Sequence, residues 1–258
     1  MNLFLYFYSP KNLFNMIEIK DLHKNFGSKK VLQGVNLTIE QGETIVIIGR
    51  SGCGKSVLIK HIVGLLSPDS GYVKVEDKIV NDLTEKELYE LRKKFGFLFQ
   101  GAALFDSMTV EENVGLPLVE SKIVHTKSDI KKIVEEKLSL VGLEEILNLK
   151  PSELSGGMKK RVALARALVT NPSYILYDEP TTGLDPIMSD SIDQLIKDLS
   201  EKLNVTSVVV THDMYSVKNV ANRVAMMNEG VIYFTGKPEE LLNSTDKVIE
   251  DFIRRTEV

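Results

Sequence analysis

The segment Gly49–Ser56, which reads GRSGCGKS, constrains the fold of this chain more than any other stretch. It follows the β-branched apolar run ETIVII, which ends at Ile48, and it leads into Lys55–Leu66, where apolar residues recur at helical spacing. Glycines at positions 49, 52 and 54 allow backbone conformations in which several N–H groups converge on one point. A strand, a glycine-rich turn and a helix in this order predict a cradle for phosphate groups.

The residues of this turn have separate tasks in such a cradle. The Lys55 ammonium would lie beside the outer phosphates of a nucleotide, and the Ser56 hydroxyl would be a ligand for magnesium. The helix that begins at Lys55 adds the positive end of its dipole. We therefore predict a nucleotide-binding segment that comprises Gly49, Arg50, Ser51, Gly52, Cys53, Gly54, Lys55, Ser56 and Val57.

Two acidic residues follow a second apolar run, Tyr174–Tyr177, which reads YILY. In an open α/β sheet, ligands bind at the carboxyl ends of the strands, so Asp178 and Glu179 are expected at the nucleotide. Asp178 is suited to hold magnesium through its waters, and Glu179 is suited to polarise an attacking water. A solvated acidic turn is the alternative, but it does not explain why an apolar strand should deliver both acids to one point.

Strand and helix patterns alternate along the chain, which favours an α/β fold with a parallel sheet covered on both faces. Helical patterns dominate from about 102 to 170, with Pro117 and Pro151 as expected breaks, and this stretch resembles a helical insert. Strands are predicted at 17–22, 31–39, 43–48, 72–80, 95–99, 174–177 and 205–210, with a strand pair around 223–234. Helices are predicted at 55–66, 85–94 and 187–202, with two short helical stretches at the end of the chain.

Composition limits the classes of function. The 258 residues carry a formal net charge of −4, so the chain has no global basic field that would attract nucleic acid. Cys53 is the single cysteine, which excludes an intrachain disulfide and fits a reducing compartment. No apolar run reaches the roughly 20 residues that span a bilayer. The apolar segment 1–15 does not resemble a signal peptide, and we interpret it as an extension that precedes a start at Met16, or as a short arm that lies on a membrane or partner.

Leu154–Gly157, which reads LSGG, resembles the signature motif of the ATP-binding cassette (ABC) ATPases. Other motifs of that family occur in their usual order and extend the resemblance over residues 16–258. Phe26 resembles the aromatic residue that stacks on adenine, Gln100 the glutamine of the Q-loop, Gly183–Asp185 the D-loop, and His212 the switch histidine.

The resemblance implies ATP hydrolysis by in-line attack of water, with ATP and Mg²⁺ bound between two copies of the chain. Lys55, Gln100, Glu179 and His212 would be the catalytic residues, with Glu179 as the general base, and the metal would be held by Ser56, Gln100 and Asp178. Ser155, Gly156 and Gly157 would bind the γ-phosphate of the nucleotide held by the other copy. A hydroxyl and backbone N–H groups at the start of a helix suit an anion, although a glycine pair there can also be merely structural.

The resemblance also implies a fold: a RecA-like core, an antiparallel β portion near the N-terminus, a helical subdomain from about 101 to 165, and one ABC ATPase domain over 16–258. The tail IRRTEV is expected to touch the partner protomer. Cys53 stands where serine is common, beside Lys55 and near a helix N-terminus. We hypothesise that this thiol is acidic and reactive. The alternative is a small residue that fills the space of a serine.

The stretch Leu98–Leu118 is most similar to the Mla/Mkl subgroup, whose ATPases work with a membrane permease and an MCE-domain protein in phospholipid trafficking. This implies a homodimer at the cytoplasmic face of the inner membrane, with no nucleic acid as partner. Leu104, Phe105 and Met108 would form a groove for the permease's coupling helix, or else would pack the helical insert. Three alternatives stay open: an importer ATPase for amino acids or another small solute, a non-transport cassette that acts on nucleic acid or the ribosome, and a degenerate regulatory cassette.

Overall fold

Alternating apolar residues of the central strands face two separate layers of the molecule. The computed structural model describes residues 16–121 and 126–256, so the predicted extension 1–15 lies outside the described residues. Ile45 and Ile47 of β3 (Thr44–Ile48) pack toward one core, and Val46 and Ile48 pack toward the other. The strand is therefore buried on both faces, as its continuous apolar run predicts.

Within the described part of the chain the strands form a six-stranded and a four-stranded sheet. The larger has the order β10-β9-β3-β8-β7-β6, in which only the β9–β10 pair is antiparallel among the described pairings. Its other strands are β6 (Phe95–Leu98), β7 (Tyr174–Asp178), β8 (Thr206–Thr211), β9 (Arg223–Asn228) and β10 (Val231–Gly236). The smaller sheet is antiparallel, with the order β2-β1-β4-β5, and consists of β1 (Ile17–Phe26), β2 (Lys29–Ile39), β4 (Ser70–Val75) and β5 (Lys78–Ile79).

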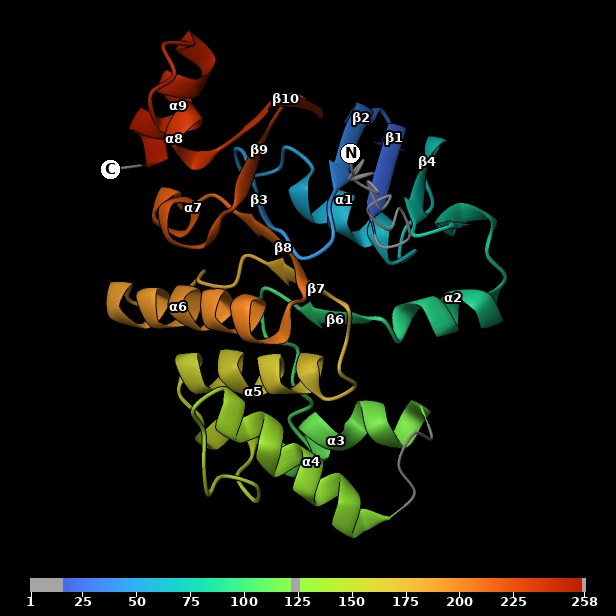
Figure 1. The fold of residues 1–258 in the computed structure, drawn as a ribbon, viewed down its shortest axis with the longest axis vertical. Helices are drawn as coiled ribbons and strands as arrows, with labels where there is room; N and C mark the ends of the chain where they lie inside the picture. The colour runs from blue at the N-terminus through green and yellow to red at the C-terminus, as the bar shows by residue number, and fades with distance from the viewer. Residues whose placement is uncertain (1–15, 122–125, 257–258) are drawn as a thin grey trace, which may run out of the picture.

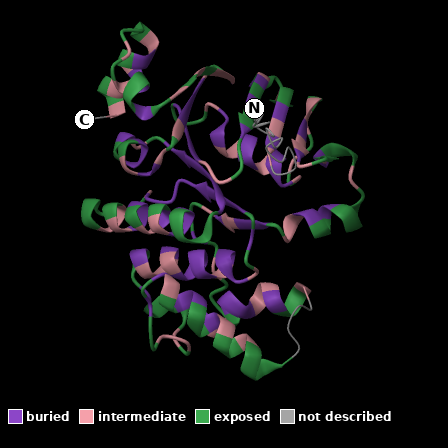
Figure 2. Ribbon diagram, in the orientation of Figure 1, coloured by how far each residue is buried: buried purple, intermediate pink, exposed green. Residues whose placement is uncertain are grey.

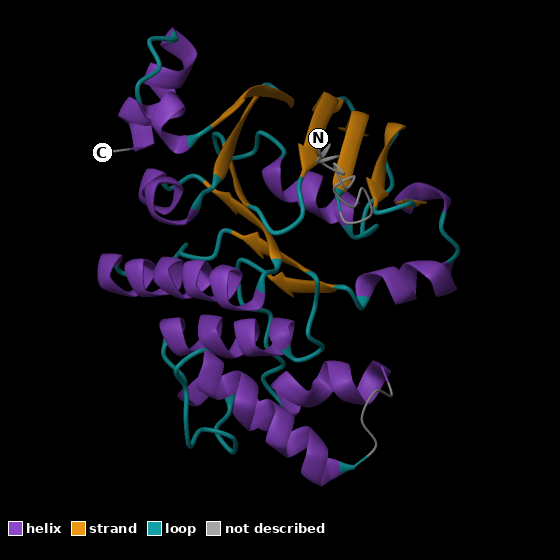
Figure 3. Cartoon of the chain, viewed as in Figure 1, coloured by secondary structure: helices purple, strands orange, loops and turns teal. Residues whose placement is uncertain are grey.

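The helix that follows the glycine-rich turn, α1 (Lys55–Ile62), lies between the two sheets and packs on β4, β7 and β8. On the opposite face of the larger sheet lie α5 (Gly156–Leu168), α6 (Pro186–Leu203) and α7 (Met214–Val220), as Figure 1 shows. Further helices of the described chain are α2 (Glu85–Arg92), α3 (Val110–Ser121), α4 (Lys127–Leu140), α8 (Pro238–Leu242) and α9 (Lys247–Thr256). Figure 3 shows α3 and α4 grouped below α5, away from the strands.

Close packing fixes α5 against the edge of the larger sheet. A Cβ at Gly96 of β6 would lie 2.5 Å from the backbone oxygen of Ala167, so this contact requires glycine. Figure 2 shows that the side of α5 that faces the sheet is buried, as are the central strands. The helix that begins at the LSGG segment is thus held firmly on the strand that leads to Gln100.

Two local sequence predictions are wrong. Pro117 does not break a helix but lies inside α3, where it removes one backbone N–H donor, usually at a cost of about 3 kcal/mol. The helix continues because Val110, Val114 and Leu118 are fully or almost fully buried against the helical layer. The run 72–80, read as one strand, turns at Glu76 into the β4–β5 hairpin. Sequence reasoning also missed α7.

The packing of α6 on α7 encloses a carboxyl group. Asp193 and Ser216 are both 0% exposed, and the Ser216 hydroxyl donates to the two Asp193 oxygens at 3.0 and 2.8 Å. The pKa of Asp193 is raised to about 7, mainly by burial and to a smaller extent by the carboxylates of Asp213 and Asp190, against the lowering effect of the Ser216 hydrogen bond. Asp193 therefore binds a proton in the folded state that the unfolded chain releases near pH 4.

We predict that Asp193→Asn flattens the pH dependence of stability. The folded pKa is raised, so the contribution of this group is complete below about pH 4 and is lost as the pH rises to about 7. The asparagine variant should therefore gain stability relative to the wild type across that window, by about 2 kcal/mol or more at pH 8. Urea denaturation at pH 5 and pH 8 measures this, with Asp198→Asn on the same helix as the control. Parallel pH dependence in wild type and Asp193→Asn would contradict it.

Candidate functional site

The register of the parallel strands brings the sequence-predicted residues to one edge of the sheet. Ile48, the last residue of β3, pairs with Thr211 at the end of β8, and Asp178 at the end of β7 pairs with Val210. The residues that follow these strand ends are therefore neighbours, although they are far apart in the chain. They belong to the glycine-rich turn, to the Asp178–Glu179 pair and to His212.

Glycine is required in the turn itself. Gly49 has a φ of 155°, and a Cβ there would lie 2.5 Å from the backbone oxygen of Met227 and 2.7 Å from the sulfur of Cys53. Gly54, with a φ of 110°, is the N-cap residue that precedes α1. A Cβ added at Gly52 would meet no atom within 4 Å, so this part of the turn is open toward the space in front of it. The turn therefore presents backbone rather than side chains at its centre.

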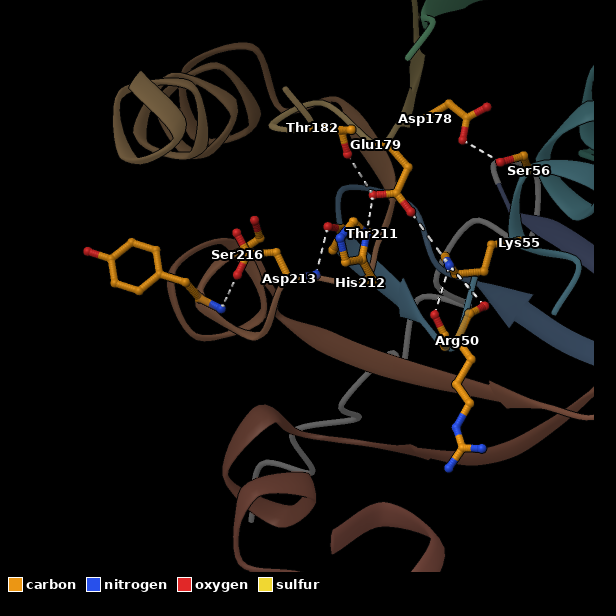
Figure 4. A network of polar contacts seen from close by, with 12 residues as sticks. Arg50, Lys55, Ser56, Asp178, Glu179, Thr182, Thr211, His212, Asp213 and Ser216 are labelled. Carbon is orange, nitrogen blue, oxygen red and sulfur yellow. Dashed lines mark hydrogen bonds and ion pairs between the residues drawn. The ribbon is translucent and has the colours of Figure 1, made fainter. Parts of the chain in front are cut away.

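Lys55 places a buried ammonium group inside the turn. Its Nζ donates to the backbone oxygen of Gly49 at 2.8 Å and lies 3.5 Å from Oε1 of Glu179. The side chain is 6% exposed, so this charge is largely removed from water. Figure 4 shows the Glu179 carboxylate between Lys55 and His212. A desolvated cation held in this position suits the outer phosphates of a nucleotide.

Ser56 and Asp178 form a direct hydrogen bond across the site. The Ser56 hydroxyl donates to Oδ1 of Asp178 at 2.6 Å, and Asp178 is largely buried. No cluster of three or more His, Cys, Asp or Glu side chains in the described ranges could hold a metal ion. One hydroxyl and one carboxylate fit Mg²⁺, which usually takes one or two carboxylates and completes its shell with water and substrate phosphates.

Glu179 is held in place from three directions. Its backbone is in the left-handed region, with a φ of 50°, and its N–H donates to Val210 O at 2.8 Å. Its Oε2 lies 2.8 Å from Nδ1 of His212 and accepts from the Thr182 hydroxyl at 3.2 Å. The His212 side chain is 57% exposed, so it can approach a ligand while it contacts Glu179.

A cavity of about 670 Å³ lies in front of this arrangement. Its wall contains most of the sequence-predicted residues, including Phe26, Gln100, Glu179 and His212. Asp178 reaches the same region through Ser56. Sequence reasoning missed the lining residues Lys29, Val31, Phe252, Arg255 and Thr256, of which the last three belong to α9 and carry no motif that could have identified them.

The LSGG segment lies elsewhere. Ser155, Gly156 and Gly157 do not contribute to the wall of this cavity, whose lining residues are all within the described ranges. The Ser155 hydroxyl accepts from the Met158 N–H at 3.2 Å and so begins α5, while Ser155 and Gly156 are exposed. The start of α5 therefore lies outside the cavity that Phe26, Lys55 and Glu179 line.

The residues expected to form one groove after Gln100 separate in the structure. Leu104 packs against the larger core. Phe105 is 50% exposed and lines a hollow of about 370 Å³ with Leu116, Pro117 and the stacked rings of Phe97 and Phe99. Met108 lines a different hollow. Leu104 therefore packs the interior, as one alternative expected, whereas Phe105 and Met108 line two different hollows and do not share one groove.

The hypothesis of an acidic Cys53 thiol is wrong. Burial raises the pKa of Cys53, and this outweighs the lowering effects of the Lys55 charge and of nearby backbone hydrogen bonds. The side chain packs against the core beside the glycine-rich turn. The alternative interpretation, a small residue that fills a serine-sized space, fits this packing.

A family model described as "ABC transporter" matches residues 32–182. The chain belongs to the ABC transporter family. It is 42% identical over 240 residues to the probable ribonucleotide transport ATP-binding protein mkl of Mycobacterium tuberculosis. That alignment covers 92% of this chain and 66% of the relative, so the chain spans about two thirds of that protein's length.

Other ABC relatives of similar identity have names that refer to different transported substances. The methionine import ATP-binding protein MetN of Clostridioides difficile is 44% identical, over 92% of this chain and 74% of that protein. The intermembrane phospholipid transport system ATP-binding protein MlaF of Haemophilus influenzae is 40% identical, over 93% of this chain and 90% of that protein. Overall similarity therefore identifies the ABC cassette without identifying its cargo.

The solved dimer of the ATP-binding cassette MJ0796, in a post-hydrolysis state with ADP and Pi, superimposes with a TM-score of 0.79 at 38% identity, over 86% of this chain and 98% of that one. The ABC fold expected from the sequence is confirmed, and the chain is an ATP-hydrolysing cassette. In the described parts of the ABC chain no helix is long and apolar enough to cross a membrane.

We predict that Cys53 reacts slowly with iodoacetamide in the folded protein. Its raised pKa leaves little thiolate at pH 8, whereas the same thiol in the unfolded chain ionises normally. Mass spectrometry of timed samples, with and without urea, should give a rate at least ten times higher for the unfolded chain. A folded protein that reacts faster than the unfolded one would contradict this prediction.

Proposed function

We propose that this chain is the ATP-hydrolysing subunit of a membrane transporter and that it acts as a homodimer with ATP and Mg²⁺. The geometry around Glu179 carries the proposal, because it joins a carboxylate, a histidine and a buried lysine at the mouth of one cavity. Phe26, half exposed at the rim, would stack on the adenine ring. Residues 49–57 would enclose the phosphates through backbone N–H groups.

Lys55, Ser56, Gln100 and Asp178 would organise the phosphate end of the cavity. Lys55 is already desolvated, so little reorganisation is needed when it meets the β- and γ-phosphates. Ser56, Asp178 and Gln100 would hold magnesium, which when bound supplies positive charge to the phosphate oxygens. The hydrogen bond between Ser56 and Asp178 supports this assignment, since it brings two oxygen ligands together.

Glu179 would accept a proton from the attacking water, and His212 would hold Glu179 and contact the γ-phosphate. The 2.8 Å contact between His212 Nδ1 and Glu179 Oε2 fixes one carboxylate oxygen, while Oε1 faces Lys55. Phosphoryl transfer needs mainly position and electrostatic stabilisation, and both are built into these contacts.

Ser155, Gly156 and Gly157 would bind the γ-phosphate of a second copy. Ser155 and Gly156 are exposed at the start of α5, and all three residues lie outside the chain's own cavity, which supports this assignment. The helix offers N–H groups and the positive end of its dipole to an anion. The dimeric state of the similar MJ0796 cassette supports a closed pair of chains.

We further propose phospholipid as the cargo, with a permease and an MCE-type protein as partners at the cytoplasmic face of a membrane. Similarity to MlaF and the apolar hollow around Phe105 support this choice. That hollow would receive a helix of the permease. Import of an amino acid is the second candidate, supported by the similarity to MetN at 44% identity. The net charge of −4 gives no support to a nucleic-acid partner.

We predict that Glu179→Gln lowers kcat for ATP at least 100-fold and leaves ATP affinity within about threefold. The amide cannot accept a proton, but it keeps the size of the side chain and its contact with His212. Phosphate release and binding of a fluorescent ATP analogue measure the two quantities. Normal turnover in this variant would exclude Glu179 as the base.

The cargo can be tested on the intact assembly. The tagged chain, purified from membranes in mild detergent, should retain an integral membrane protein and phospholipid that mass spectrometry detects. Phe105→Asp should release the permease and leave the ATPase rate of the isolated chain unchanged, whereas the exposed Tyr89→Asp should have no effect on either. A permease that co-purifies without lipid, and whose addition makes ATPase activity respond to methionine or cystine, would favour the solute importer.

A further inference from the structure

Lys160 is a buried cation that the nucleotide motifs do not explain. It lies in the second turn of α5, the helix that begins at the LSGG segment, and it is 5% exposed. Burial of a lysine ammonium is costly unless it is paired and hydrogen-bonded. Desolvation lowers its pKa, and the neighbouring charges of Asp178 and Glu179 act in the opposite direction.

The Lys160 ammonium joins the ends of two strands. Its Nζ donates to the backbone oxygen of Gln100, which follows β6, and to the backbone oxygen of Glu179 at 3.3 Å, which follows β7. The backbone oxygen of Glu179 also accepts a hydrogen bond from the Thr182 N–H at 3.3 Å. The backbone orientation of the proposed base and that of the proposed magnesium ligand thus depend on one side chain of α5.

A second cation of α5 holds the segment after Gln100. The Arg166 guanidinium donates to the backbone oxygens of Ala102 and Ala103, both at 2.7 Å. These alanines have φ values of 61° and 49°, a left-handed conformation that costs non-glycine residues roughly 1 kcal/mol or more each. The segment is therefore held in this shape by α5, and Lys160 is the part of that contact that also reaches Glu179.

We infer that Lys160 is a positioning residue for ATP hydrolysis that links the start of α5 to Gln100 and Glu179. This inference rests on the proposed function, in which the start of α5 binds the nucleotide of the second copy. A shift of α5 on docking would move Lys160 and, through two backbone oxygens, both groups of its own site. Lys160 thereby couples the two nucleotides of the dimer.

Lys160→Met tests the inference on the full chain. The variant keeps length and packing but removes the charge and the hydrogen-bond donor. Lys159→Met is the matched control, because Lys159 is adjacent and half buried and has no polar contact with either oxygen. We expect Lys160→Met to lower kcat at least 20-fold with KM for ATP within about twofold, and to bring the Hill coefficient of hydrolysis close to 1. Lys159→Met should match the wild type.

The outcomes separate this inference from the proposed function. A wild-type chain that does not hydrolyse ATP, or a fully active Glu179→Gln variant, would defeat the proposed function. If those two proteins behave as proposed while Lys160→Met keeps the wild-type kcat and Hill coefficient, the inference alone fails. A raised KM with unchanged kcat would also overturn it. Thermal unfolding of both lysine variants identifies a global loss of structure, and a Lys160→Arg variant, which keeps a charged donor, must then recover kcat toward the wild-type value at unchanged KM.

Discussion

The parallel register of β3, β8 and β7 is the constraint on which the rest of the site depends. A slip of one residue would move a strand end by about 3.3 Å and turn its side chains to the other face. Because β3 is apolar on both faces, alternation cannot fix this register. Polar contacts at the amino ends of the strands do so. The Asn222 side chain accepts from the Thr44 N–H at 2.8 Å, and the Thr206 hydroxyl accepts from the Gly42 N–H at 2.9 Å.

Charge balance at the opposite strand ends follows from that register. Asp178 and Glu179 are largely buried, and the largely buried cations Lys55 and Lys160 lie near them. Carboxylates so far from water would be costly without these partners. The two lysines differ in what they hold: Lys55 contacts the Glu179 side chain, whereas Lys160 contacts its backbone. The side chain of Glu179 and the backbone at the end of β7 are therefore each held by a different lysine.

Sequence patterns predicted the parts of the fold in which local chemistry and tertiary context agree. β3, the glycine-rich turn and α1 are specified by residues next to one another, and so are β7 and the two acids after it. Prediction from the sequence failed where the local structure depends on contacts between residues far apart in the chain. Burial of one side of α3 overrides Pro117, and desolvation of Cys53 outweighs its lysine neighbour. The approach of α9 to the cavity and the reach of Lys160 to two strand ends have no local signal, since both depend on how separate elements pack.

Cargo specificity must lie outside the residues that handle ATP. Relatives whose names refer to ribonucleotide, methionine and phospholipid transport are 42%, 44% and 40% identical to this chain. A cassette that never contacts the cargo can still be matched to it through the surface that a permease touches. In the proposed function such a surface would be the apolar hollow beside Gln100, where Phe105 is half exposed and Arg166 anchors the adjoining backbone to α5. Because Lys160 lies on the same helix as Arg166, the inferred coupling would carry a displacement of that hollow through α5 to Glu179.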